Sequence, residues 1–241
     1  MNAPARPLGF VAASPCGGIA AAIGGAAALL RHSGALWLEA ERALVVADLH
    51  FEKGSAYARR GQMLPPYDTR ETLRRLALEI EALSPRLVVL LGDTLHDGGA
   101  EARIDAEDAA AVDRLAAGRT LLWIVGNHDA DGPRRLAGEV GDEIALNGLL
   151  LRHEPQAGLQ PGEVAGHLHP CARVRGRGAS VRRRCFVTDG ERLILPAFGA
   201  YAGGLNVRDA AFSGLFARPP TAVALGPRKA HAVAWGALGA D

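Results

Sequence analysis

The sequence predicts an α/β fold in which two sheets of mixed strand direction pack as a sandwich and are flanked by helices. Short apolar runs are typical of buried strands, and helix-type periodicity separates them in the first half of the chain. After Gly141 the pattern changes to short strands joined by glycine turns. Helical crossovers followed by hairpins favour two mixed sheets over one doubly wound sheet.

The first long helix is expected from Asp68 to Leu83. Asp68 and Glu71 have capping-box spacing, and Ser84 with Pro85 ends the apolar periodicity. Its buried face is predicted to consist of Leu73, Leu76, Ala77, Ile80 and Leu83.

A second helix is expected over residues 105–117, ended by Gly118. It should bury Ala109, Val112 and Leu115. Strands are predicted at residues 43–47, 86–91, 120–125, 143–146, 149–152, 163–166, 172–175, 181–187 and 192–195. The alternation after Asp209 indicates a further strand in the tail.

Length and composition fit one domain over residues 1–241, with an Ala/Gly-rich start (1–30) and a tail (210–241) to which the sequence assigns no role. Nearly half of the 241 residues are apolar, so a sizeable core can form. Three cysteines without CxxC spacing argue against a disulfide framework and favour the cytoplasm. Residues 15–30 are too short and too weakly apolar for a membrane span, and are expected to fray and then form a strand, with an export signal as the alternative.

Polar side chains follow several of the predicted strands at the point where each strand ends. Because strand ends on one side of an open sheet collect in a common crevice, residues far apart in sequence can meet there. Six of the eight histidines belong to this series, among them His96 and His128, which are discussed below. The metal-type ligands are Asp48, His50, Asp93, Asn127, His153, His167 and His169.

These donors suit hard to borderline divalent ions such as Mn, Fe, Zn or Mg, because no thiolate is among them. Seven ligands are too many for one tetrahedral ion and suit two ions about 3.5–4 Å apart. The two oxygens of Asp93 allow it to bridge both. Paired ions activate water and neutralise charge on phosphoryl oxygens, so a phosphate ester is the expected substrate. His128 is then expected to stabilise the transition state or protonate the leaving oxygen, with Asp129 orienting its imidazole.

The motifs DLH at 48, GDTLHD at 92, GNHD at 126, RHEP at 152 and GHLHP at 166 resemble, in order, the five-block signature of calcineurin-like metallophosphoesterases. The resemblance implies a four-layer α/β/β/α sandwich and a catalytic His128. It also implies one metal held by Asp48, His50, Asp93 and His169, and a second held by Asp93, Asn127, His153 and His167.

A narrower resemblance covers roughly residues 34–210. The segments starting at Glu52, Arg182 and Leu195 are similar to the bacterial ligase-associated DNA damage response endonucleases. This implies a manganese-dependent phosphodiesterase acting on single-stranded or damaged DNA in repair, with iron or zinc as alternative ions and a ligase or helicase as partner. His96 resembles a histidine that nuclease members carry, and would contact phosphate.

Arginines crowd a predicted hairpin that begins directly after His169. They are Arg173, Arg175, Arg177, Arg182, Arg183 and Arg184. Such a patch could bind a nucleic-acid backbone, but arginine is frequent throughout the chain and the formal net charge is only +1. The hairpin is therefore a candidate DNA contact, with an ordinary solvated surface as the alternative.

Three other functions remain compatible with the sequence. A phosphomonoesterase, a nucleotidase or a cyclic-nucleotide phosphodiesterase would use the same metal centre. A metallophosphoesterase-shaped interaction module without catalysis is disfavoured by the full ligand set and by His128. A non-catalytic DNA-binding partner of a ligase or helicase would need the basic hairpin but not His128. Sequence alone leaves the oligomeric state open.

Overall fold

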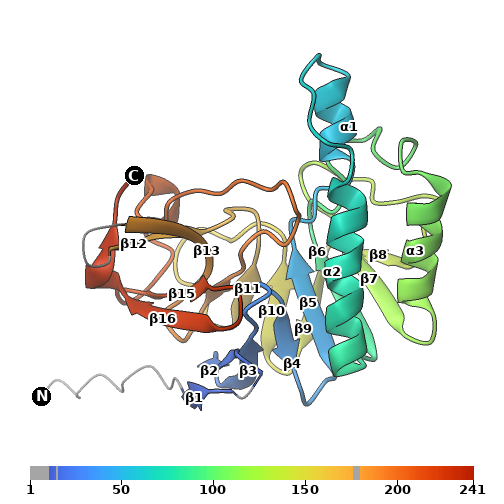
Figure 1. Ribbon diagram of the computed structural model, residues 1–241. Helices are drawn as coiled ribbons and strands as arrows, with labels where there is room; N and C mark the ends of the chain where they lie inside the picture. The colour runs from blue at the N-terminus through green and yellow to red at the C-terminus, as the bar shows by residue number, and fades with distance from the viewer. Residues whose placement is uncertain (1–10, 15, 176–179) are drawn as a thin grey trace, which may run out of the picture.

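The computed structural model describes residues 11–14, 16–175 and 180–241. Its strands form two mixed sheets (Figure 1), the first built from residues up to 141 and the second from residues after it. A core cluster with side chains of both sheets, such as Val45 and Val89 against Leu151 and Val164, shows that the sheets pack face to face. The predicted architecture of two mixed sheets flanked by helices is confirmed.

The first sheet has its eight strands in sequence order. Neighbours are antiparallel from β1 to β5 and parallel from β5 to β8. β5 and β6 are almost entirely apolar because both of their faces are covered. The strands are β1 Val11–Ala13, β2 Ile19–Ile23, β3 Ala26–Leu30, β4 Leu36–Leu38, β5 Ala43–Ala47, β6 Leu87–Leu91, β7 Thr120–Ile124 and β8 Glu139–Gly141.

The second sheet has the order β16-β15-β13-β14-β11-β10-β9, with β12 pairing β13 and β17 at one side. Only β10–β11 and β11–β14 are parallel among its described pairs. β15 and β16 confirm the strand predicted for the tail. The strands are β9 Glu143–Leu146, β10 Leu149–Arg152, β11 Glu163–Ala165, β12 Cys171–Arg175, β13 Ser180–Thr188, β14 Leu193–Ile194, β15 Thr221–Leu225, β16 Ala230–Ala234 and β17 Leu238–Gly239.

Helices α2 Asp68–Leu83 and α3 Ala106–Ala116 cover the outer face of the first sheet, where they share a core cluster with its strands. The other helices are α1 Lys53–Ala58 and the short 3-10 helices η1 Ala210–Phe212 and η2 Trp235–Ala237. α2 buries Leu73, Leu76 and Ile80 as predicted, whereas Ala77 is exposed. In the described residues, two further core clusters join strands of the second sheet to β12, β17, η1 and η2. None of the helices described is both long and apolar enough to cross a bilayer.

The capping box predicted at Asp68 is wrong. The N-cap of α2 is Tyr67, so Asp68 already lies inside the first turn, where no side-chain cap is formed. The Asp68 carboxylate instead accepts a hydrogen bond from the Gly54 main-chain N–H at 3.1 Å. Asp68 therefore joins α2 to α1, a helix the sequence analysis did not predict because it is only six residues long.

Other differences concern short elements. The Ala/Gly-rich start forms the β2–β3 hairpin in place of one strand, while β4 and β8, each three residues long, were not predicted. α3 has the predicted ends, because Asp105 caps it by accepting from the Asp108 N–H and Gly118 follows it with φ +73°. It buries Val112 and Leu115 as predicted, whereas Ala109 is only partly buried. Residues 1–10, 15 and 176–179 of the predicted start and hairpin lie outside the described residues.

Candidate metal centre

The candidate ligands follow the carboxyl ends of strands from both sheets. Asp48 follows β5, Asp93 follows β6 by one residue, and His153 follows β10. The two sheets meet at this edge, where Ala47 pairs with Ala197 in an isolated parallel bridge. The crevice predicted from strand ends is therefore present.

Five of the seven candidate ligands have left-handed backbone conformations. Non-glycine residues seldom adopt positive φ, and each instance costs on the order of 1–3 kcal/mol, so such residues cluster at functional sites. The five are Asp48 (φ 53°), His50 (φ 48°), Asp93 (φ 45°), His167 (φ 67°) and His169 (φ 46°). The turn after each strand thus directs a ligand side chain back toward the crevice.

The first cluster consists of Asp48, His50, Asp93 and His169, each offering a ligand atom within 4.8 Å of the others. His169 Nε2 lies 3.2 Å from Asp48 Oδ1 and 3.3 Å from His50 Nε2. The cluster is deeply placed, because the Asp48 side chain is fully buried and that of His50 is 4% exposed. This is the grouping that the resemblance implied for one metal.

The second cluster is centred on His153. Its Nε2 lies 3.0 Å from Asn127 Oδ1, 3.1 Å from His167 Nδ1 and 3.4 Å from Asp93 Oδ1. One imidazole nitrogen carries at most one proton, so three acceptors around it cannot all be satisfied by hydrogen bonds. This is the grouping implied for the second metal.

The spacing of these atoms fits a divalent cation. Ligands about 2.1 Å from an ion are separated by about 3.0 Å in octahedral and about 3.4 Å in tetrahedral coordination. The separations in both clusters fall in this range or close to it. Asp93 belongs to both, with Oδ1 facing His153 and Oδ2 4.0 Å from His50 Nε2.

Glycines let the ligand residues approach one another. A Cβ on Gly92 would lie 2.0 Å from His153 Nδ1, and Gly92 itself has φ +73°. A Cβ on Gly126 would lie 2.3 Å from the Asp93 main-chain nitrogen and from Asp93 Oδ1. The glycines of the GDTLHD and GNHD motifs are thus explained by close packing against ligands.

Burial keeps two of the imidazoles neutral. It is the main cause that lowers the pKa of His50 to about 2, and the nearby His169 and Lys53 act in the same direction. The pKa of the half-buried His96 falls to about 4, again mainly through burial and then through Lys53. A neutral imidazole has a free lone pair, which is the form that binds a metal.

Comparison with known proteins identifies the family. The model of the family described as calcineurin-like phosphoesterase matches residues 41–191, well over half of the chain. The chain is a calcineurin-like phosphoesterase. Among solved structures, it is similar to the Pseudomonas putida nuclease MPE, with a TM-score of 0.68 and 28% identity over 90% of this chain and 100% of that chain.

A second solved structure, Yfce, a phosphoesterase from E. coli, matches with a TM-score of 0.39 and 14% identity over 80% of this chain and 98% of that chain. The comparison with curated proteins gives no match. Members of this family use divalent metals, and the two clusters of the phosphoesterase are groups that could bind them.

His128 lies at the open side of the phosphoesterase centre, with 40% of its side chain exposed. Its Nδ1 is 2.7 Å from the main-chain oxygen of His96, and its Nε2 is 4.0 Å from Asp93 Oδ2. The ring stacks on that of His96 at 5.4 Å between centroids and 21° between planes. The carbonyl and ring of His96 therefore fix the imidazole of His128.

Asp129 has a different place from the one expected. Its carboxylate accepts hydrogen bonds from the Leu95 N–H at 2.9 Å and the Gly126 N–H at 2.8 Å. Burial raises the pKa of Asp129, while these two N–H groups lower it. The residue that orients the His128 ring is thus His96, and Asp129 joins the turn after β6 to the turn after β7.

The arginines of the β12–β13 hairpin have separate roles. Arg184 is half-buried and donates to the carbonyl oxygens of Ala197, Ala200 and Ala202, so it holds this loop of the phosphoesterase in place and is not a free substrate contact. Arg173 donates to Ser180 Oγ within the hairpin. Arg182 and Arg183 are exposed, whereas Arg177 and the side chain of Arg175 lie outside the described residues.

Lys53 is a residue that the sequence analysis missed. It lies in α1, near enough to His50 and His96 to lower the pKa of both. Burial in turn lowers the pKa of Lys53, with Asp68 opposing this and Arg184 adding to it. The sequence does contain a sign of its place near the centre, because Lys53 lies three residues after His50 in a chain with only two lysines.

Proposed function

We propose that this phosphoesterase is a binuclear metal-dependent phosphodiesterase that cleaves DNA in the cytoplasm, in a repair process with a ligase or helicase as partner. The observation that carries the proposal is the pair of clusters joined through Asp93 beneath the partly exposed His128. Two adjacent divalent ions are a recurrent arrangement in phosphatases and nucleases. The similarity to the Pseudomonas putida nuclease MPE supports a nucleic acid as the substrate, and DNA is the one we propose.

In this proposal, Asp48, His50, Asp93 and His169 hold one ion, and Asp93, Asn127, His153 and His167 hold the other. Bound divalent ions supply positive charge for the phosphoryl oxygens and make water more acidic. Manganese is the ion we propose, and iron or zinc would be compatible with the same nitrogen and oxygen donors.

The remaining chemistry falls to His128. With Nδ1 donating to the His96 carbonyl, a proton on Nε2 would point toward the centre, where Asp93 Oδ2 lies 4.0 Å away. That proton can stabilise charge on the phosphoryl oxygens or pass to the departing oxygen. In the proposal His96 contacts the phosphate, and the packing of its ring against both His50 and His128 supports this role.

A panel of substrates tests the proposal. Purified protein with Mn would be given a chromogenic phosphodiester, the matching monoester, and single- and double-stranded DNA. We expect cleavage of the diester and of DNA, with near-complete loss in Asp93→Ala because both ion sites lose a ligand.

The outcomes separate the alternatives. Turnover of the monoester alone would show a phosphomonoesterase. A protein that binds DNA, while wild type and Asp93→Ala cleave none of the substrates, would be the non-catalytic module.

A further inference from the structure

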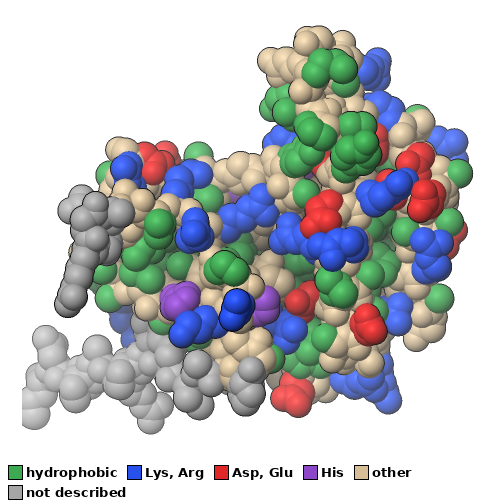
Figure 2. Space-filling view, viewed as in Figure 1, with side chains coloured by type: hydrophobic (Ala, Val, Ile, Leu, Met, Phe, Trp, Pro, Cys, Tyr) green, Lys and Arg blue, Asp and Glu red, His purple; other side chains and the backbone are tan. Residues whose placement is uncertain are grey.

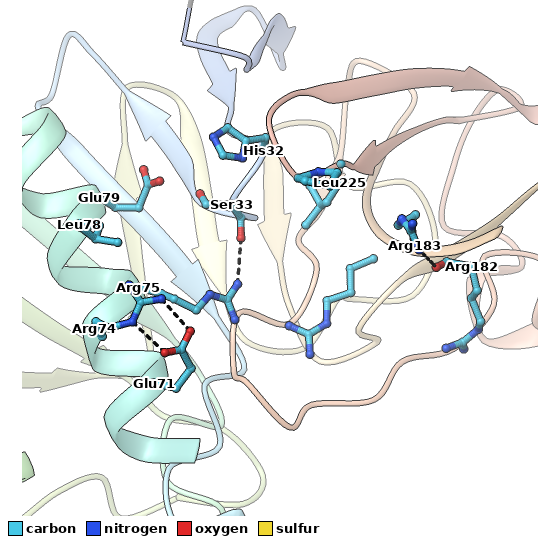
Figure 3. Close-up of a pocket in the computed structure, with 13 residues that line it drawn as sticks. His32, Ser33, Glu71, Arg74, Arg75, Leu78, Glu79, Arg182, Arg183 and Leu225 are labelled. Carbon is cyan, nitrogen blue, oxygen red and sulfur yellow. Dashed lines mark hydrogen bonds and ion pairs between the residues drawn. The ribbon is translucent and has the colours of Figure 1, made fainter. Parts of the chain in front are cut away.

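A cavity of about 680 Å³ lies between α2 and the second half of the molecule. Figure 3 shows Arg74 and Arg75 on α2 at one side and Arg182 and Arg183 at the other. In Figure 2, Lys and Arg side chains gather across the middle of this face. The volume is within the range of ligand-binding clefts, about 300–1,000 Å³.

The cavity concentrates positive charge. Its lining has five arginines, the four above and Arg184, against two glutamates, Glu71 and Glu79, which gives a formal charge of +3. The whole chain carries only +1. A cleft with one sign of charge attracts the opposite sign, so its ligand should be an anion.

Two of these guanidinium groups lie at the exposed side of the lining. The Arg74 side chain is 61% exposed and donates twice to the Glu71 carboxylate, at 2.8 and 2.9 Å, so a phosphate group would compete with that carboxylate for Arg74. The side chain of Arg183 is exposed and donates to the main-chain oxygen of its neighbour Arg182 at 3.1 Å. Arg75 is committed elsewhere, because it donates to the Phe198 and Ser33 carbonyls.

The loop 197–202 connects residues that line the cavity with a ligand of the metal centre. On the cavity side, Arg75 and Arg184 hold the carbonyls of this loop. On the other side, the Gly199 N–H donates to the Asp48 main-chain oxygen at 3.2 Å.

We propose that this cavity binds backbone phosphates of the DNA strand whose scissile phosphodiester lies at the metal centre. The inference rests on the proposed function and adds Arg74 to the binding surface. The lining also includes Leu78, Leu225 and Pro227, which suit the apolar faces of sugars and bases. A nucleic-acid strand carries phosphates for the arginines and sugars and bases for the apolar side chains, so it fits this lining better than a small inorganic anion does.

The test measures binding without catalysis. Metal-stripped protein is titrated into a fluorescent single-stranded oligonucleotide at several salt concentrations, and anisotropy gives the affinity. We expect Arg74→Ser/Arg183→Ser to weaken binding about tenfold. The slope of log K against log salt should fall by about 1.4, since each phosphate contact on a single strand contributes about 0.7. Arg86→Ser, an exposed arginine outside the cavity, is the control and should behave as wild type.

Equal affinity and equal salt slope in the wild type and the double variant would overturn the inference. Binding of inorganic phosphate by the wild type without binding of the oligonucleotide would overturn it as well. Failure of the nuclease function is visible separately, as absence of DNA cleavage by the wild type with Mn. Because Arg74 and Arg183 are exposed, the thermal midpoint of the double variant should match that of the wild type and exclude unfolding as the cause.

Discussion

His128 shows how one side chain gains its chemical role from its neighbours. Its Nδ1 faces a main-chain oxygen whose position is fixed, so the ring cannot turn away from Asp93 without losing that contact. The residue type and its place after Asn127 could be predicted from the motif. The group that orients its ring could not be predicted, because it is the main-chain carbonyl of His96, and every residue type has such a carbonyl.

We expect His128→Ala to lower kcat for the diester by about 10²- to 10⁴-fold while bound metal stays at the wild-type level, since His128 is not in either proposed ligand set. Steady-state kinetics with elemental analysis measures both quantities. His231→Ala removes an exposed histidine on β16 and is the matched control. Loss of metal together with activity would show that His128 is a ligand.

The turns after the strands are the elements that assemble the centre. Strand runs were predictable because alternation and apolar length are local properties of the sequence. The left-handed conformations of Asp48 and Asp93 were not, because these residues would seldom adopt them without the surrounding structure. Likewise, Arg184 holds the loop by donating to carbonyls 13 to 18 residues away, and the hydrophobic periodicity of the sequence does not predict such contacts.

Gly126→Ala tests the packing of one such turn. A methyl group there would lie 2.3 Å from the Asp93 main chain and carboxylate, so Asp93 must shift. We expect the free energy of unfolding to fall by about 1–3 kcal/mol and metal affinity to weaken. Denaturant titration and metal titration measure these. Gly236→Ala, where an added Cβ meets nothing within 4 Å, should leave both unchanged; similar losses in the two variants would refute the explanation.

At the scale of the whole molecule, the centre joins the two sheets. Asp48, His50, Asp93 and Asn127 come from the first half of the chain, and His153, His167 and His169 from the second. Neither cluster is complete within one sheet. The convergence of distant strand ends was predictable from the α/β pattern, whereas the prediction of one domain over 1–241 stays a prediction.

Metal should therefore stabilise the fold as a whole. With free Mn at about 100 times its Kd, binding at one site adds about 2.7 kcal/mol to the free energy of unfolding. For a chain of this size that corresponds to a rise in Tm of roughly 5–10 °C. Calorimetry with and without a chelator measures it, and Asp93→Ala should show a much smaller response. An equal response in that variant would place the stabilising ion elsewhere.

The division of ligands between the halves also bears on how the protein is made. Residues up to 141 are synthesised first, and these contain every strand of the first sheet. Such a nascent chain carries Asp48, His50 and Asp93 but none of the histidines after position 150. An unfinished polypeptide thus holds only a fraction of each ion site, and a hydrolase of this design becomes competent to cut only once synthesis has passed His169.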